Sequence, residues 1–360
     1  MAISHKGESM GAISKFEDDK SKISRIKKQL LRLDIRYQEG ISWQDIISQK
    51  DSRLGFNEWK KERMQLDAER KEIEDLLLVY VNAFRQKKLK EISAIKFKHY
   101  CSICLIIRDE NEYLEEWLDW HLGQGVEHFY IYDHGSKMPV VNFVKSLSES
   151  VQDKVTVIGW SGKHKSAQHE AYNDCLKNYA KQSRWIGFID ADEMVRVKKG
   201  GNLQTFLKDY EAYAGVMVLW VLYGADGQVK KTKAPLRERF LNASVQNIKQ
   251  SLGKVFVQPM LIRQMVIHNG YPIECFDVVD EYKNQVDEAA VVPSNKTTDL
   301  ICVDHYFTKS YEEWIEKMKR GSADAYYNRR YKEFFFYNPD MKDCMENNNL
   351  TQEYAISTKC

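Results

Sequence analysis

The sequence has no long hydrophobic run and no large excess of charge of one sign. No apolar stretch approaches the roughly 18 residues that a membrane-spanning helix needs, and the first residues contain no apolar core of a secretory signal. We therefore expect a cytoplasmic protein, with any membrane contact peripheral and at the inner face. The formal net charge of +2 argues neither for nor against nucleic acid. Because no motif supports such a role, we expect no nucleic-acid partner.

The sequence also lacks a second closely spaced cysteine pair beside Cys101 and Cys104. Seven cysteines at irregular spacing favour reduced thiols in a cytoplasmic protein. Cys101 and Cys104 have the spacing of a metal or redox pair, but they fall in a predicted strand, where residues three apart face opposite sides. We interpret them as buried structural cysteines.

The composition is that of an ordinary globular protein, with 43% hydrophobic and 29% charged residues in 360 positions. Changes of pattern along the chain predict four parts. Residues 1–14 are expected to be disordered, 15–96 to form a helical arm, 97–338 to form an α/β domain, and 339–360 to form a C-terminal tail.

Two segments of the arm have helical periodicity. Apolar residues step by three and four over 16–38, and they repeat every seven over 57–90 at Trp59, Leu66, Ile73 and Tyr80. Two amphipathic helices with a short link predict an αα-hairpin. The pattern leaves two roles open: packing on the main domain, or docking on a partner such as a second copy of the chain. The basic run at 85–98 is either a solvated face or a contact for an anionic membrane surface.

From residue 99 onward, short apolar runs alternate with helical patterns. The apolar runs at 100–107, 126–132, 154–158 and 185–189 are typical of buried strands. A helix with Leu114, Trp117 and Leu118 on one stripe follows the first run, and another helix is expected at about 166–182. This alternation predicts βαβ units and a mostly parallel sheet with right-handed crossovers.

Three carboxylates follow the last of these apolar runs within four residues. They are Asp190, Asp192 and Glu193. Two aspartates one residue apart at a strand end can hold Mg²⁺ or Mn²⁺ and leave coordination sites open for water and phosphate oxygens. The Asp-x-Asp pattern alone is weak, because an acidic surface turn would look the same.

Several motifs occur in an order that resembles a known group of enzymes. They are the segments 108–117 (RDENEYLEEW), 130–133 (YIYD), 190–193 (DADE), 220–224 (WVLYG), 238–240 (ERF) and 305–310 (HYFTKS). Together they resemble glycosyltransferases of the GT-A fold, and more narrowly the family-92 and family-2-like group. The resemblance covers roughly 99–325, and the joint order is far more specific than any single motif.

The resemblance implies both a fold and a reaction. The fold is a Rossmann-like, mostly parallel sheet flanked by helices. The reaction moves a sugar from a nucleotide-sugar donor to an acceptor hydroxyl, with inversion and with Mn²⁺ or Mg²⁺ as cofactor. The acceptor is a growing surface glycan, a lipid-linked sugar or a protein, as in surface-glycan or glycoconjugate synthesis. The polar stretches 223–235 and 269–299 are the expected acceptor-binding loops.

For the metal ion, we predict Asp190 and Asp192 as ligands, together with one further protein ligand. His305 follows an apolar strand and matches the late metal-binding histidine of GT-A enzymes. His268 is the competing candidate, and a structural role is the alternative for either histidine.

For the donor, we predict residues that follow the strands, because ligands of α/β sheets bind at the carboxyl ends of the strands. The diphosphate is expected to contact Lys309, with Lys254 and Arg320 as further cations. The nucleotide is expected to contact Arg108, Asn111, Glu112, Asp133 and Gln168, and Asp190 shares in donor binding. Asn111 has the alternative role of a helix cap, and Glu112 that of a first-turn carboxylate.

For the general base, we predict Glu238, because it matches a family position, with Asp226 as the second candidate. Either residue has the alternative of a salt-bridged surface acid, and Glu238 has Arg237 and Arg239 beside it.

Two other functions are alternatives to a glycosyltransferase. A sugar-phosphate nucleotidyltransferase uses a similar sheet, but it would need a Gly-rich basic loop where 108–112 is acidic. A catalytically degenerate domain would bind a nucleotide sugar or glycan as a scaffold through its helical arm. Intact Asp190, Asp192 and His305 argue against this alternative.

Overall fold

The computed structural model describes residues 7–39, 52–199, 201–244, 252–286, 297–321 and 329–342. The chain forms two compact units, Met1–Ala94 and Ile95–Cys360, and each is described by itself. Of the segments expected to be disordered or a tail, 1–6 and 343–360 lie outside the described residues.

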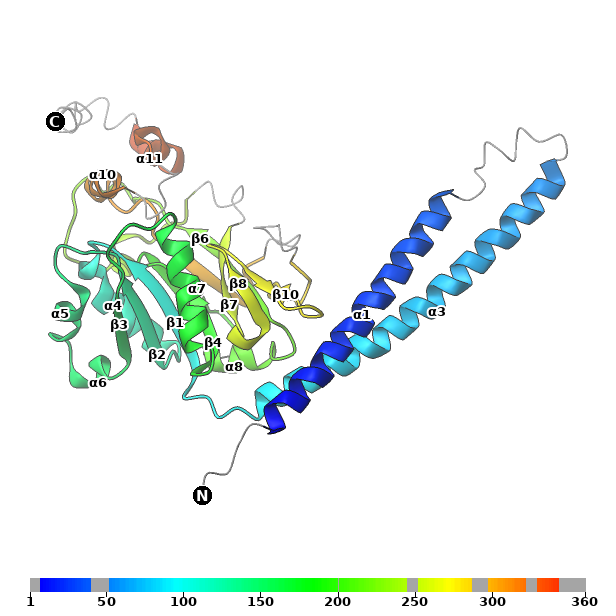
Figure 1. Ribbon diagram of the computed structural model, residues 1–360. Helices are drawn as coiled ribbons and strands as arrows, with labels where there is room; N and C mark the ends of the chain where they lie inside the picture. Colours follow the sequence, from blue (N-terminus) through cyan, green and yellow to red (C-terminus); the bar gives the residue numbers. More distant parts are fainter. Residues whose placement is uncertain are drawn as a thin grey trace, which may run out of the picture. The chain divides into compact units, whose positions relative to one another are not determined.

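The first unit consists of two long helices that run side by side, α1 (Gly7–Glu39) and α3 (Ser52–Ser93) (Figure 1). Arg36 pairs with Glu69 at 3.1 Å, and Arg70 pairs with Asp34 at 3.0 Å. Helix α1 begins at Gly7, so residues 7–14 are helical although we expected disorder there. Missing apolar periodicity does not prevent a helix, because propensity and continuation of a long helix also count. No helix in the described ranges is long and apolar enough to cross a membrane.

The second unit begins with four parallel strands. They are β1 (His99–Ile107), β2 (His128–Asp133), β3 (Val155–Gly159) and β4 (Ser183–Phe188). Their order across the sheet is β3-β2-β1-β4, and every neighbouring pair is parallel. The βαβ units predicted from the sequence are therefore confirmed.

The sheet continues beyond β4 with strands of both directions. The order is β4-β7-β6-β11-β5, with β7 (Gly253–Val257) antiparallel to both β4 and β6 (Gly215–Leu222). Strand β11 (Ile301–His305) is parallel to β6, and β5 (Glu193–Val197) is antiparallel to β11. Because β5 begins only a tight turn after β4, no helical crossover separates them. The α/β class is confirmed, with a more mixed sheet than we expected.

Short strands complete the β-structure of the described residues. Strand β10 (Val278–Val279) pairs with β6, while β8 (Ile262–Met265) and β9 (Gly270–Pro272) form a separate antiparallel pair. The remaining helices are α4 (Asn111–Gly123), α5 (Val140–Val144), α6 (Glu149–Gln152), α7 (Ala167–Tyr179), α8 (Leu203–Lys208), α9 (Leu236–Arg239), α10 (Tyr311–Arg320) and α11 (Tyr331–Tyr337), with a 3₁₀ turn at Pro259–Leu261.

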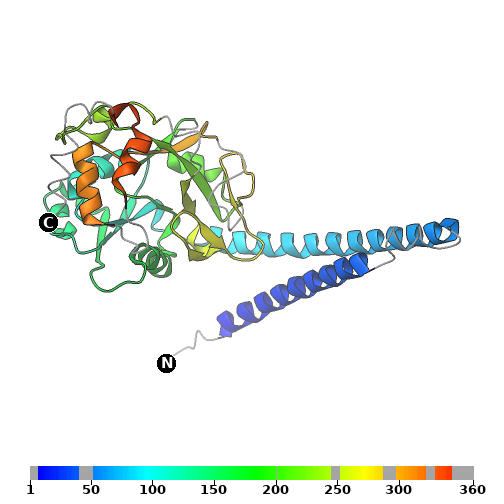
Figure 2. The same ribbon diagram turned by 90° about the horizontal axis from the view of Figure 1, so that it is seen from above.

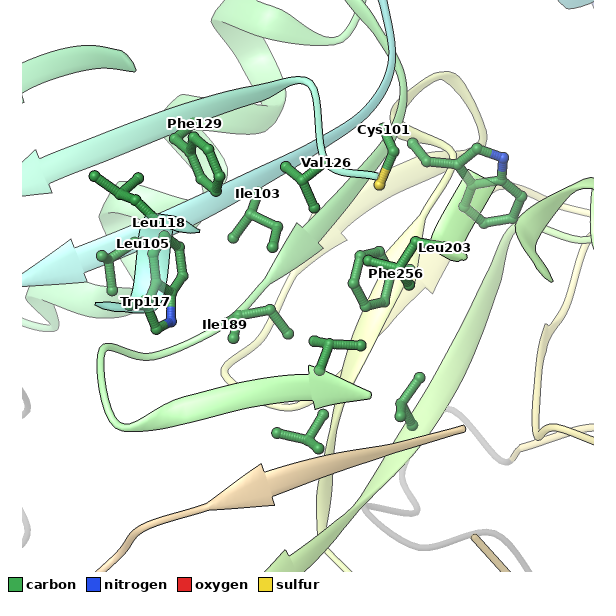
Figure 3. Packing of buried hydrophobic residues seen from close by; sticks show 14 of the residues in the cluster. Cys101, Ile103, Leu105, Trp117, Leu118, Val126, Phe129, Ile189, Leu203 and Phe256 are labelled. Atoms are coloured by element: carbon green, nitrogen blue, oxygen red, sulfur yellow. The ribbon is translucent and has the colours of Figure 1, made fainter. Parts of the chain in front are cut away.

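The main core lies between the sheet and helix α4. Ile103 and Leu105 of β1 pack with Trp117 and Leu118 of α4 (Figure 3), which is the stripe predicted from the sequence. Helix α7 crosses the other face of the sheet (Figure 1), where Tyr172 contacts Phe188. Cys101 and Cys104 are both buried, as predicted. Helices thus pack on both faces of the sheet that contains β1 and β4.

Helices α10 and α11 lie side by side over those strand ends (Figure 2). An aromatic cluster joins them, with Tyr311 and Trp314 from α10 and Phe334 from α11. Ser310 caps α10 in a reciprocal arrangement with Glu313, so the start of this helix is well defined.

Candidate active site

Strands β2 and β3 lie on one side of β1, and β4, the next strand along the chain, lies on its other side. The strand order therefore reverses at β1. Ligands of α/β sheets bind in the crevice at such a point. A cavity of about 320 Å³ lies there. Its charged and titratable lining residues are Arg108, Glu110, His134, Asp190, Asp192, His268, His305, Lys317, Arg320 and Arg329, and Gln168 lines it as well.

Two hydrogen bonds between Asp190 and Glu193 close the acidic turn between β4 and β5. The backbone N–H of Glu193 donates to the Asp190 carbonyl at 3.1 Å, and the backbone N–H of Asp190 donates to the Glu193 carboxylate at 2.9 Å. The pairing of β5 with β11 sets Glu193 opposite His305, and the backbone N–H of Tyr306 donates to the Asp192 carbonyl at 2.9 Å. Residues that are far apart in the sequence are thus brought together by strand pairing.

Asp190 is held by three side chains. One carboxylate oxygen accepts hydrogen bonds from Gln168 at 3.0 Å and Tyr172 at 3.1 Å, and the other accepts from Lys254 at 2.7 Å. Lys254 is fully buried and also lies 3.7 Å from Glu193. Asp190 itself is 32% exposed, so this fixed carboxylate still reaches the cavity.

Asp192 is buried beside two lysines and a histidine. Its Oδ2 accepts a hydrogen bond from Lys317 at 2.6 Å and lies 3.7 Å from the Lys309 Nζ, while Oδ1 lies 3.6 Å from the His305 Nε2. Burial raises the pKa of Asp192, but Lys317, Lys309 and His305 outweigh this effect and hold the pKa well below its usual range. The carboxylate is therefore ionised at neutral pH.

Glu193 lies directly behind these residues and is completely buried. Burial raises the pKa of Glu193 well above its ordinary value, and the charges of Asp190 and Asp192 raise it further. Its Oε1 lies 3.8 Å from the His305 Nδ1. Neither of these two buried atoms has a hydrogen-bond partner among the described residues.

The two predicted histidines both line the cavity. His305 ends β11 and its ring lies 4.5 Å from that of Trp220. The His268 Nδ1 lies 3.0 Å from the Gly253 carbonyl oxygen, which leaves Nε2 available. Burial is the main cause that lowers the pKa of both residues, that of His268 to about 4. Both rings are thus neutral at pH 7, as a metal ligand must be.

Lys309 and Arg320 converge on Glu110, which follows β1. The Lys309 Nζ lies 3.3 Å and the Arg320 Nη2 lies 2.9 Å from the same Glu110 oxygen. Lys309 has φ of 53°, is only 3% exposed, and lies over the Tyr113 ring at 4.1 Å. Lys309 is therefore a buried cation held in the left-handed region, and not a surface lysine.

Lys317 was not assigned a role from the sequence. Its Nζ donates to Asp192 and to the Phe307 carbonyl at 2.9 Å. Burial lowers the pKa of Lys317 to about 8. A sequence signal existed, because Lys317 lies three residues after the buried Trp314 and so shares the inward face of α10. Glu110, Tyr172 and Glu193 were likewise not assigned to the site.

Three of the residues predicted to bind the nucleotide do not line this cavity. Asn111 donates to the Met138 carbonyl at 2.8 Å and does not cap α4, whose N-cap residue is Glu110. Glu112 pairs with Lys231 at 2.7 Å. Asp133 accepts from the backbone N–H groups of Ser136 and Val140, each at 2.9 Å. These partners of Asn111, Glu112 and Asp133 are backbone groups and Lys231. Arg108 and Gln168, by contrast, line the cavity.

The two predicted bases also lie outside this cavity lining. Glu238 is exposed on α9, whereas Arg239 beside it is buried and pairs with Glu313. The carboxylate of Asp226 accepts from the backbone N–H groups of Leu241 and Asn242, which fixes the loop before α9. The assignment of a base to either residue stays a prediction, and the geometry adds no support to it.

An α/β crevice lined by acidic side chains, histidines and cations is typical of enzymes that act on phosphorylated ligands. The model of glycosyltransferase family 92 matches residues 99–338. The chain therefore belongs to glycosyltransferase family 92. The family resemblance seen in the sequence is confirmed.

Plant proteins of this family are similar to the chain. It is 28% identical over 248 residues to a glycosyltransferase family 92 protein of Arabidopsis thaliana, which covers 63% of this chain and 41% of that relative. It is 30% identical over 111 residues to one of Ricinus communis, which covers 31% of this chain and 20% of that relative. The chain thus matches less than half the length of these relatives.

Proposed function

We propose that the chain moves a sugar from a nucleotide-diphosphate donor to an acceptor hydroxyl, with inversion, using a divalent cation and a domain of the GT-A type. The observation that carries this proposal is the ionised Asp192, which faces His305 and two lysines at the crevice where strand order reverses. Such a site combines a carboxylate and an imidazole, which can bind a metal ion, with lysines that can donate hydrogen bonds to phosphate oxygens. The nature of the acceptor remains as expected from the sequence: a glycan, a lipid-linked sugar or a protein.

The residues present fit a divalent cation, although the described residues include no group of three or more His, Cys, Asp or Glu placed to hold one. The 3.6 Å between the Asp192 Oδ1 and the His305 Nε2 is long for a hydrogen bond. Two ligands that share one ion at about 2.1 Å lie roughly 3 to 3.6 Å apart. Glu193 behind His305 would be the outer partner that orients a metal-binding imidazole. Mn²⁺ or Mg²⁺, completed by water and diphosphate oxygens, would neutralise the leaving group.

The cations around the cavity support binding of the diphosphate. Lys317 and Arg320 line it, and Lys309 lies behind them in contact with Glu110. As the sugar leaves, negative charge grows on the diphosphate, and cations already fixed in position stabilise that charge without reorganisation. Arg108 and Gln168 line the cavity and are the proposed contacts for the rest of the nucleotide. Asp190, which pairs with Lys254, lines the same cavity.

Thermal stability against a panel of nucleotide sugars, with and without Mn²⁺, tests this proposal. The variant is Asp192→Ala, and Asp153→Ala, an exposed acid after α6, is the matched control. A donor at about 100 times its dissociation constant adds roughly 2.7 kcal/mol to the free energy of unfolding. We expect a Mn²⁺-dependent increase in melting temperature with one donor, lost in Asp192→Ala and kept in the control. No increase with any donor in the wild type would contradict the proposal.

Turnover separates the enzyme from a degenerate binding module. The donor found in the panel is incubated with the wild type and Mn²⁺, and release of its nucleoside diphosphate is measured. Release that Asp192→Ala abolishes supports catalysis. Tight donor binding without any release, with each class of acceptor supplied in turn, would support the scaffold alternative instead.

A further inference from the structure

One oxygen of the proposed metal ligand is already occupied by a side chain of the protein. The Lys317 Nζ lies 2.6 Å from the Asp192 Oδ2, and it donates a second hydrogen bond to the Phe307 carbonyl at 2.9 Å. The lysine side chain is only 7% exposed and lies over the Phe307 ring. Loss of either partner from a buried ion pair is strongly destabilising, because it leaves a buried charge without a counterion. Lys317 thus places a positive charge on the carboxylate that a cation at Oδ1 and His305 would have to approach.

The charge around the cavity adds to this obstacle. Six cationic side chains line the cavity or pair with its acids, namely Arg108, Lys254, Lys309, Lys317, Arg320 and Arg329. They face four carboxylates, those of Glu110, Asp190, Asp192 and Glu193. The formal charge of this described set is therefore positive before any ligand binds. A divalent cation entering alone would meet repulsion, whereas the negative charges of a diphosphate would reverse the balance.

Lys254 and Lys317 hold the two aspartates in different ways. Lys254 is fully buried, is absent from the cavity lining, and contacts both Asp190 and Glu193. Lys317 lines the cavity and extends from the inward face of α10, where Arg320 follows it one turn later. A phosphate group in the cavity can therefore offer Lys317 a new partner, while Lys254 keeps its own.

We propose that Lys317 is an internal counterion that makes cation binding at Asp192 conditional on the diphosphate. In the free protein Lys317 donates a hydrogen bond to Asp192 and supplies the positive charge that a metal ion supplies when it is bound. When a diphosphate enters, Lys317 transfers its hydrogen bond to a phosphate oxygen and releases the Asp192 Oδ2. The inference rests on the proposed function, and it adds an order of binding in which the cation alone binds poorly.

The test measures Mn²⁺ binding directly, through the paramagnetic resonance signal of free Mn²⁺, so it does not depend on turnover. The wild type is titrated with Mn²⁺ alone and with UDP, GDP or ADP in separate runs. We expect one nucleoside diphosphate to tighten Mn²⁺ binding at least about tenfold, as is typical of coupled sites. Lys317→Met should bind Mn²⁺ without nucleotide about tenfold more tightly than the wild type and gain less from the nucleotide.

Two further variants complete the test. Lys317→Arg keeps the positive charge and should keep Mn²⁺ binding dependent on the nucleotide. Lys177→Met removes an exposed lysine of α7 and should behave as the wild type does. The comparison of the wild type with and without nucleotide needs no variant, so misfolding of Lys317→Met would not remove the test.

The outcomes separate this inference from the proposed function. Mn²⁺ binding that Asp192→Ala abolishes, but that is equally tight with and without nucleotide, would keep the metal site and overturn the counterion. A folded Lys317→Met that binds Mn²⁺ as weakly as the wild type would also overturn it. No Mn²⁺ binding by the wild type with any of the nucleotides would overturn the proposed metal site and this inference together.

Discussion

The carboxyl ends of β1 and β2 lie next to each other in the sheet, yet their polar residues have different partners. After β1, Glu110 meets Lys309 and Arg320, which arrive from the far end of the chain. After β2, the Asp133 carboxylate accepts from the backbone N–H groups of Ser136 and Val140, which follow it closely in the chain. The first strand borders the point where strand order reverses, and the second does not. Closeness to that point, more than position at a strand end, decides which acids enter the site.

The largest effect is expected at the crevice. Asp192→Asn keeps the shape of the side chain and removes its charge, so Lys317 and Lys309 lose an anionic partner and the proposed metal ion loses an anionic ligand. We expect the rate of nucleoside diphosphate release from the donor to fall by about 10²- to 10³-fold. An unchanged rate, with correct folding checked by circular dichroism, would show that the crevice is not the active site.

The second prediction concerns the support behind the crevice and its dependence on pH. Burial raises the pKa of Glu313, but hydrogen bonds from Arg239, Ser310 and Tyr113 outweigh it and lower the pKa to about 2. Because the folded pKa is below the unfolded one, the unfolded state binds protons first as pH falls. The stabilisation is complete above about pH 4.5 and disappears as pH falls towards 2; it amounts to about 3 kcal/mol.

Urea denaturation of the wild type and Glu313→Gln from pH 7 to pH 3 checks this prediction. The free energy of unfolding of the two proteins should differ most at neutral pH, and the difference should shrink as the solution becomes acidic. A difference that stays constant over this range would mean that the Glu313 carboxylate is not the group responsible. Glu333→Gln, on α11, serves as the control.

The third prediction sharpens the comparison at β2. Asp133→Asn weakens two hydrogen bonds to backbone N–H groups, so we expect a loss of about 1 to 3 kcal/mol in the free energy of unfolding. Donor affinity, measured by calorimetry, should stay unchanged at a temperature where the variant is folded. A large loss of affinity with little loss of stability would instead support Asp133 as a nucleotide contact, as the sequence predicts.

The smallest effect is expected at Glu238. Its side chain is exposed and has no interacting partner in the described part of the chain, so Glu238→Gln should change stability by no more than about 0.5 kcal/mol. The rate of donor turnover should stay close to that of the wild type. A loss of the size expected for Asp192→Asn would instead support Glu238 as the base and require the loop around α9 to approach the acceptor.

Local pattern predicted much of the first half of the α/β domain. The apolar runs and the stripe of α4 are confirmed as β1 to β4 and the core helix, because each depends on residues close in sequence. Patterning did not predict that β7 would run antiparallel between β4 and β6, or that β5 would pair with β11. Those pairings join strands that are far apart in the chain, and hydrophobic periodicity contains no information about such partners.

The sequence by itself determined the family, the α/β class and the position of the acids Asp190 and Asp192 after a buried strand. These follow from residue order and from the periodicity of apolar side chains. Only the tertiary structure decided which charges meet those acids. It brought His305 beside Asp192 through the β5–β11 pairing, and it turned Lys317 inward from α10. Electrostatic partners act over a few ångströms, and only the packed fold sets those distances.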